Sequence, residues 1–185
     1  MRHKTRYHKS SMQEQVQINE HIELRIVSPT IAQEKFNNIV DSREHLLPWL
    51  PWVYFYDDHG VDALREYQVN QAQYFRSGIN YTYDIFFDGD FAGSIELMHL
   101  SETNHSCEIG YWLSRKMTGK GIMTAAVNKL TEMAFRNLNM HVVTILASDQ
   151  NAASCAVAKR CGFNLDATLP ERVFLDGNYH NECVF

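Results

Sequence analysis

The sequence lacks the residue spacings that bind metal ions. Its four cysteines form no CxxC pair and fit no zinc-finger spacing, and its nine histidines form no HxH or HxxxH pair. We therefore expect no metal ion, and we expect reduced, mostly buried thiols. The four cysteines are Cys107, Cys155, Cys161 and Cys183.

Long apolar runs are also missing. No stretch approaches the length of a transmembrane helix, and no apolar segment typical of a signal peptide is present. We therefore expect a cytoplasmic protein with no membrane partner. A chain of 185 residues with 45% hydrophobic and 21% charged residues is typical of one globular domain. Because we find no linker and no repeat, we place this single domain at residues 12–185.

Acidic residues are absent from the first eleven positions, which carry four of the 17 lysines and arginines. This segment has no periodicity, so we predict a disordered basic arm at residues 1–11; the alternative is an arm that binds ribosomal RNA. The remaining chain holds 13 basic and 22 acidic residues, a net charge of -9. Such a body disfavours nucleic acid as a partner and suits a cationic amine, although the charge could equally serve solubility alone.

Hydrophobic periodicity predicts a mixed α/β (α+β) fold in the order β–α–α–β–β–β–α–β–α–β–β. Pro29 opens the first helix, with Ile31, Phe36, Ile39 and Val40 spaced for one face. The predicted strands are 22–26, 81–87, 91–100, 107–113, 142–146, 172–175 and 179–185. Three later helices are predicted: one from Asp57-Asp58 to about Ser77, one from Gly121 to about Asn137, and one from Asn151 to about Cys161.

Residues 46–52 read LLPWLPW, where two prolines block regular structure and two tryptophans require burial or a partner. We weigh two interpretations of this segment. It is either a packed corner of the core or, through Trp49 and Trp52, a wall of the substrate-binding cleft.

The stretch on which the rest of the chain depends is 107–125, which reads CEIGYWLSRKMTGKGIMTA. An apolar strand passes into a loop with Gly119 and Gly121 and then into a helix. Glycines let backbone N–H groups approach a phosphate closely, and a helix N-terminus adds partial positive charge. The stretch therefore predicts an anion site, although a short glycine loop is often only a helix entry.

Further polar residues lie around this stretch. Glu108 and Glu96 each stand in an apolar strand, where a carboxylate faces solvent or is held in a cleft with a raised pKa suited to a base. Asn151 opens the last helix and can cap it, whereas Ser154 lies one turn in and can point to a cleft.

Taken together, the order and spacing of these features from Ile22 to the C-terminus resemble the GNAT superfamily of acyl-CoA-dependent N-acetyltransferases. EIGYWL followed by GKGIMTAAV, the late DGNYHNE hairpin and PWLPW resemble the Rim-type branch, which acetylates ribosomal proteins at an N-terminal serine or alanine. The resemblance implies a mostly antiparallel mixed sheet of about seven strands flanked by about four helices. One departure is Lys116, where the family's loop begins with Gln or Arg.

The resemblance also implies acetyl-CoA as co-substrate. Its pyrophosphate would lie on the loop amides, its pantetheine arm would pair with a strand that splays from its neighbour, and Asn151 would contact that arm. The implied cofactor-binding residues are Trp112, Leu113, Ser114, Thr118, Gly119, Lys120, Gly121, Ile122, Met123, Thr124, Asn151 and Ser154.

For catalysis, the resemblance implies direct transfer to a primary amine without a metal. The tyrosine that many members use as acid is replaced by Ala158, so Ser154 is the candidate acid. Glu108 is the expected base, with Glu96 or a water chain as alternatives. A backbone N–H near Trp112 or Leu113 would polarise the thioester.

The expected acceptor is the N-terminal α-amine of a ribosomal protein, held beside Trp49, Trp52 and Glu96. The alternatives are a small amine, such as a polyamine, an aminoglycoside or an amino-acid derivative, and a non-catalytic acyl-CoA-binding regulatory module. A homodimer is expected by analogy only.

Overall fold

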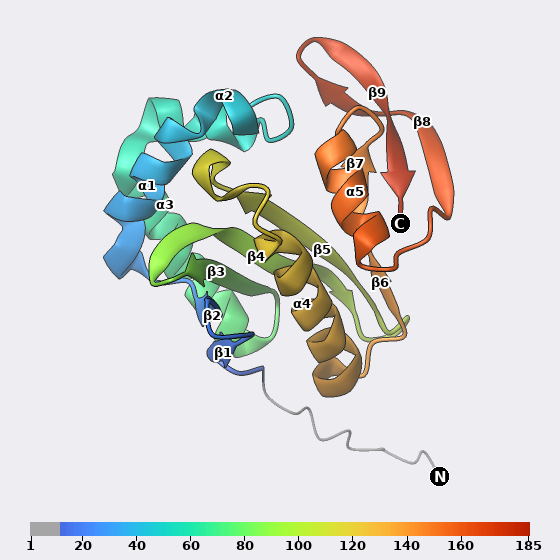
Figure 1. Ribbon diagram of the computed structural model, residues 1–185, viewed down its shortest axis with the longest axis horizontal. Helices are drawn as coiled ribbons and strands as arrows, with labels where there is room; N and C mark the ends of the chain where they lie inside the picture. The colour runs from blue at the N-terminus through green and yellow to red at the C-terminus, as the bar shows by residue number, and fades with distance from the viewer. Residues whose placement is uncertain (1–11) are drawn as a thin grey trace.

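The computed structural model describes residues 12–185, so the arm predicted for residues 1–11 lies outside the described residues. Within residues 12–185 the strands form two sheets (Figure 1). The strands are β1 (Gln15–Gln17), β2 (Ile22–Ile26), β3 (Tyr81–Phe87), β4 (Asp90–Ser101), β5 (Ser106–Leu113), β6 (Val142–Thr144), β7 (Leu146–Ser148), β8 (Ala167–Leu175) and β9 (Asn178–Val184).

The larger sheet has six strands in the order β1-β2-β3-β4-β5-β6, and the smaller sheet has the order β7-β9-β8. All neighbouring strands are antiparallel except β5 and β6, which run parallel. The predicted fold class, a mixed and mostly antiparallel sheet with flanking helices, is therefore confirmed.

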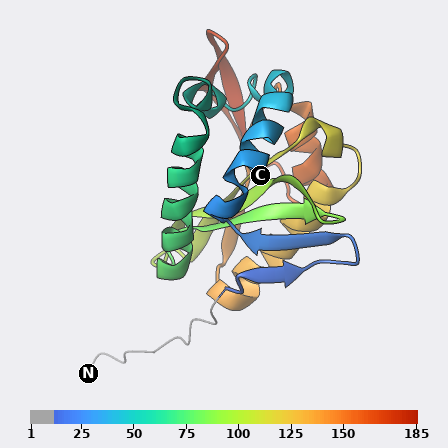
Figure 2. The same cartoon turned by 90° about the vertical axis from the view of Figure 1, so that its left-hand side faces the viewer.

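The helices cover both faces of the larger sheet. α4 packs on one face, where Ala126, Val127 and Leu130 are fully buried in the main hydrophobic cluster. On the other face α1 and α3 run side by side (Figure 2). No helix within residues 12–185 is long and apolar enough to cross a membrane. The helices are α1 (Ala32–Asp41), α2 (Arg43–Leu46), α3 (Trp52–Ser77), α4 (Ile122–Leu138) and α5 (Ala152–Arg160), with 3-10 turns at Pro29–Ile31 and Arg115–Met117.

The prediction of one continuous strand over 142–146 is wrong. β6 ends at Thr144, and β7 begins at Leu146 in the other sheet. Between them, Ile145 exchanges two backbone hydrogen bonds of 2.9 Å with Phe185 at the end of the chain. The apolar run is therefore shared between two sheets because its second half pairs with β9 instead of β5.

The second helix begins earlier than predicted. Pro51, with φ of −58°, occupies the N-cap position of α3, so the helix starts at Trp52 and not at Asp57-Asp58. The two aspartates lie inside its first part, which kinks at Gly60, where φ is +67°. The predicted C-terminal end is confirmed, because Gly78 follows Ser77 in the left-handed conformation with φ of +75°.

The buried face of α1 also differs from the apolar pattern. Val40 was predicted on that face but is 47% exposed, whereas Lys35 and Asn38 are buried. Lys35 is accommodated by a partner from β3, since its ammonium lies 2.7 Å from a carboxylate oxygen of Asp84. A periodicity of apolar residues does not reveal a face that is buried through an ion pair.

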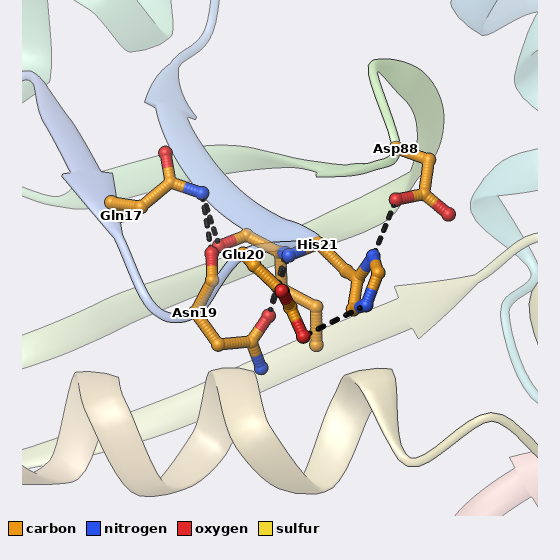
Figure 3. A network of polar contacts seen from close by, with 6 residues as sticks. Gln17, Asn19, Glu20, His21 and Asp88 are labelled. Atoms are coloured by element: carbon orange, nitrogen blue, oxygen red, sulfur yellow. Dashed lines mark hydrogen bonds and ion pairs between the residues drawn. The ribbon is translucent and has the colours of Figure 1, made fainter.

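Polar contacts tie the turn between β1 and β2 to the turn between β3 and β4 (Figure 3). The side-chain oxygen of Asn19 accepts hydrogen bonds of 2.9 Å from the backbone N–H groups of His21 and Ile22. His21 Nδ1 lies 2.7 Å from Asp88, and this hydrogen bond raises the pKa of the exposed imidazole. These contacts join the two turns at one end of the sheet.

Candidate active site

β5 separates from its neighbour halfway along its length. β5 pairs with β6 only through Ser106, Cys107 and Glu108. After β6 the chain continues into β7, which pairs with β9 and not with β5. Residues 109–113 therefore have β4 on one side and a cleft on the other. The cleft has a volume of about 780 Å³, and residues 109–113, 146–148 and the start of α4 line it. A strand edge exposed in a cleft can pair with an extended ligand.

The glycine loop closes one end of this cleft. Gly119 and Gly121 both have left-handed backbones, with φ of +76° and +75°, and an added Cβ would meet nothing within 4 Å at either position. Conformation, not space, therefore requires glycine here. Gly121 is the N-cap of α4 and provides no side chain to bond the first-turn N–H groups, which leaves them for an anion.

Arg160, at the end of α5, adds a positive charge to the same cleft. Its Nε donates a hydrogen bond of 3.3 Å to the hydroxyl of Thr124 in the first turn of α4. Sequence reasoning missed this residue, because the chain alone does not show that the end of α5 lies against the start of α4. A guanidinium beside free helix N–H groups is suited to phosphate.

The first turn of α5 borders the cleft next to β5. The side-chain oxygen of Asn151 accepts a 3.1 Å hydrogen bond from the N–H of Ser154, so Asn151 caps the helix. The hydroxyl of Ser154 lies 3.0 Å from the hydroxyl of Tyr111 on β5. Burial raises the pKa of Tyr111 to about 12, against the opposing effect of the hydrogen bond with Ser154.

Tyr111 is the second residue that sequence reasoning missed. A signal was available, because strand alternation places Tyr111 on the opposite face from Glu108 and Gly110, toward α4 and α5. The sequence could not show that Ser154, 43 positions later, would supply the partner for its hydroxyl. The pair places two hydroxyl groups at the wall of the cleft.

A second cavity of about 740 Å³ lies on the face of the sheet covered by α1 and α3. Trp52 and Glu96 line this cavity, whereas Trp49 and Glu108 line the first cleft. The two spaces share walls at Leu50, Met98, Gly110, Tyr111 and Trp112, so they meet at the middle of β5. The proline–tryptophan segment thus contributes one tryptophan to each space.

The carboxylates of Glu96 and Glu108 have different surroundings. Burial raises the pKa of the Glu96 carboxyl, while a hydrogen bond of 3.1 Å from the hydroxyl of Thr82 and the charge of Lys35 oppose the shift. Glu108 has an oxygen 3.1 Å from Nδ1 of His99, whose side chain is 74% exposed. Glu96 is therefore the desolvated carboxylate, whereas Glu108 is paired with the exposed side chain of His99.

Most of the residues predicted for cofactor binding come together in the first cleft. Ser114 and Lys120 do not line it. The backbone N–H of Ser114 is bonded to Ala92, and the ammonium of Lys120 lies over the ring of Phe87, 5.1 Å from its centre. The residues that do line it are Trp112, Leu113, Thr118, Gly119, Gly121, Ile122, Met123, Thr124, Asn151 and Ser154.

Comparison with known proteins agrees with this geometry. The model of the family described as Acetyltransferase (GNAT) domain matches residues 22–164. The chain belongs to the GNAT acetyltransferase family. It is 31% identical over 165 residues to the "Putative ribosomal N-acetyltransferase YdaF" of Bacillus subtilis (strain 168), with 89% of each chain covered. The resemblance stated from the sequence is therefore confirmed, and the protein is an N-acetyltransferase.

Two further relatives show how far the likeness extends within this GNAT family. The "Ribosomal-protein-serine acetyltransferase" of Escherichia coli (strain K12) is 27% identical, covering 94% of this chain and 96% of the relative. The solved structure of a RimL ribosomal L7/L12 acetyltransferase in complex with coenzyme A superposes with a TM-score of 0.86 at 24% identity, covering 93% of this chain and 97% of that chain. That superposition shows a shared fold.

Proposed function

We propose that the protein transfers an acetyl group from acetyl-CoA to the N-terminal α-amine of a ribosomal protein. The observation that carries the proposal is the free edge of β5, which leads directly to the glycine loop and the uncapped start of α4. The names of the two curated relatives support a ribosomal acceptor. A ribosomal acceptor in turn implies a cytoplasmic enzyme.

The residues of the cleft fit coenzyme A in charge and shape. The N–H groups from Thr118 to Thr124, with Arg160 beside them, would hold the pyrophosphate. The unpaired edge of residues 109–113 would pair with the extended pantetheine arm, and Asn151 stands at the opposite wall. When bound, acetyl-CoA supplies an activated acetyl thioester, and a backbone N–H of Trp112 or Leu113 would polarise its carbonyl.

Proton transfers are assigned to Glu96 on β4 and to Ser154 on α5. An amine must lose a proton to attack, and we assign that proton to Glu96 because burial raises the pKa of its carboxyl toward the working pH. Glu108, the base expected from the resemblance, remains the rival. Ser154 would donate a proton to the departing thiolate, with its hydroxyl oriented by Tyr111 at 3.0 Å.

Removing the hydroxyl of Ser154 tests the acid. Ser154→Ala is expected to lower kcat by about 10²-fold, the lower end for a general acid, while the affinity for coenzyme A stays unchanged. Tyr111→Phe keeps Ser154 but removes its partner, so its kcat should lie between the wild-type value and that of Ser154→Ala. Steady-state kinetics and calorimetric titration with coenzyme A provide the two measurements. Normal turnover by Ser154→Ala would remove Ser154 from the mechanism.

The function itself is tested by an acetylation screen read by mass spectrometry. The full chain and acetyl-CoA are incubated with ribosomal proteins, with peptides of their N-termini and with small amines, including spermidine. The proposal expects a mass gain of one acetyl group at an N-terminal α-amine. Acetylation of a small amine alone would overturn the ribosomal acceptor, and binding of acetyl-CoA without any turnover would indicate a regulatory module. A homodimer and a single domain at residues 12–185 remain predictions.

A further inference from the structure

Aromatic residues form part of the wall of the second cavity. Six of them surround a space of about 740 Å³, which is the size of a pocket for a small organic molecule. The indole of Trp52 meets the ring of Tyr56 edge-on at 5.8 Å and that of Trp112 at 5.9 Å, so three rings support one another. The six aromatic residues are Trp52, Phe55, Tyr56, Tyr67, Tyr111 and Trp112.

We propose that this cavity binds a bulky apolar or aromatic group next to the acceptor amine. The inference rests on the proposed function and names the acceptor class: N-termini that begin with a large apolar residue instead of serine or alanine. A serine or alanine side chain would leave most of an aromatic cavity of this size unfilled. Burying a large apolar side chain there would contribute to transition-state binding, because the amine and its side chain enter together.

The junction between the two spaces shows how the amine could reach the thioester. Gly110 lies in register with Glu96, and the terminal methyl of Met98 occupies the space where a side chain at position 110 would be. A Cβ on Gly110 would lie 2.2 Å from that methyl and 3.6 Å from a carboxylate oxygen of Glu96. The amine would therefore cross over Gly110 beside Glu96, displacing the flexible side chain of Met98.

The charges in the cavity disfavour a polyamine. A polyamine carries several ammonium groups and requires a matching set of carboxylates. Glu96 and Glu66 are the carboxylates that line the cavity, and the ammonium of Lys35 lines it as well. Lys35 is engaged with Asp84 at 2.7 Å and Ser94 at 2.8 Å, so it stays in place as a positive charge. One amine beside Glu96, followed by an apolar group, matches this arrangement.

Peptides that differ only in their first residue test the inference. Peptides starting with serine, alanine, leucine, phenylalanine or tryptophan, with one common following sequence, are compared with spermidine as acceptors of the full-length enzyme. We expect kcat/KM for the leucine and phenylalanine peptides to exceed that for serine by roughly 10- to 100-fold, the range for burial of such a side chain. The readout is coenzyme A release, confirmed by peptide mass.

A cavity-filling variant with a matched control identifies the site. Ala63 lines the cavity from α3 and is half-buried, so Ala63→Phe should occupy the space and abolish the preference for leucine and phenylalanine. Val69 lies on the same helix, is 42% exposed and does not line the cavity, so Val69→Phe should keep the preference. Retention of the preference in Ala63→Phe, with both variants folded by circular dichroism, would overturn the inference.

The outcomes separate the inference from the proposed function. If serine and alanine peptides react as fast as or faster than the bulky ones, the inference is overturned while N-terminal acetylation stands. If spermidine reacts and no peptide does, or if no acceptor reacts although acetyl-CoA binds, both are overturned. A preference for bulky first residues that disappears only in Ala63→Phe supports both.

Discussion

Replacing Glu96 by glutamine is expected to lower kcat/KM for the acceptor by about 10²–10⁴-fold, the contribution of a positioned general base. Glutamine has the same shape and can still accept the hydrogen bond from Thr82, but it cannot take a proton. The wild-type rate should fall as the pH drops through the raised pKa of Glu96, because the protonated carboxyl is no longer a base. In Glu96→Gln this loss should be absent, leaving only the titration of the acceptor amine near about 8.

Glu108→Gln is the matched control for this experiment. Glu108 lies on the same face of β5 as Gly110, but its carboxylate is paired with His99 at 3.1 Å at the outer end. The rate of Glu108→Gln should still fall at acidic pH, as that of the wild type does. Pre-steady-state or steady-state rates of both variants between pH 5 and 9 make the comparison. If the acidic fall disappears in Glu108→Gln and persists in Glu96→Gln, the base is Glu108, as the family resemblance implied.

The stability of the Glu96 variant shows whether lost activity is lost chemistry. The folded protein raises the pKa of Glu96 above that of the unfolded chain, so the folded state binds the proton more tightly. This stabilisation is present below the unfolded pKa and is lost as the pH rises through the folded pKa. At neutral pH the carboxylate therefore destabilises the fold, and Glu96→Gln should unfold at a temperature no lower than that of the wild type.

The glycine loop and the helix cap of the donor cleft could be predicted because local signals determine them. Gly119 and Gly121 adopt left-handed backbones that few other residues tolerate, and the helix that follows is amphipathic. Asn151 has the residue type and position of a helix cap, and it caps α5. Each of these features depends on residues within one turn of each other, so the sequence alone indicates them.

The rest of the site could not be predicted, because contacts between distant segments build it. The division of residues 142–146 between two sheets depends on Phe185, which pairs with Ile145 across forty positions. The partnership of Tyr111 with Ser154 likewise depends on how α5 lies against β5. The cavity beside Glu96 depends on Lys35, a charged residue buried on a helix face that an apolar pattern assigns to other positions.

Lys35→Met is expected to lower the free energy of unfolding by about 3–5 kcal/mol, the cost of leaving one charge of a buried pair without its partner. For a chain of this length, that loss lowers Tm by roughly 6–20 °C. Lys35 is 3% exposed and Asp84 is 1% exposed, and the second carboxylate oxygen of Asp84 has no hydrogen-bond partner among the described residues. Thermal and urea unfolding measure the change.

Two controls separate the buried pair from a general effect of losing a cation. Arg65→Met breaks the exposed pair with Asp62 and should cost less than about 1 kcal/mol. The double variant Lys35→Met with Asp84→Leu removes both charges and should recover most of the lost stability. If Lys35→Met lowers the free energy of unfolding by no more than Arg65→Met does, the pair of Lys35 and Asp84 is not desolvated in solution.

The same variant also reports on catalysis through Glu96. The charge of Lys35 lowers the pKa of the Glu96 carboxyl and so opposes the effect of burial. In Lys35→Met the positive charge is lost, so the pKa of the Glu96 carboxyl rises further. The pH at which the rate falls on acidification should therefore be higher than in the wild type. A residue that only holds α1 on the sheet would change Tm and leave the pH profile in place. A shifted profile, measured below the lowered Tm, therefore identifies Lys35 as a positioning residue that sets the protonation of the proposed base.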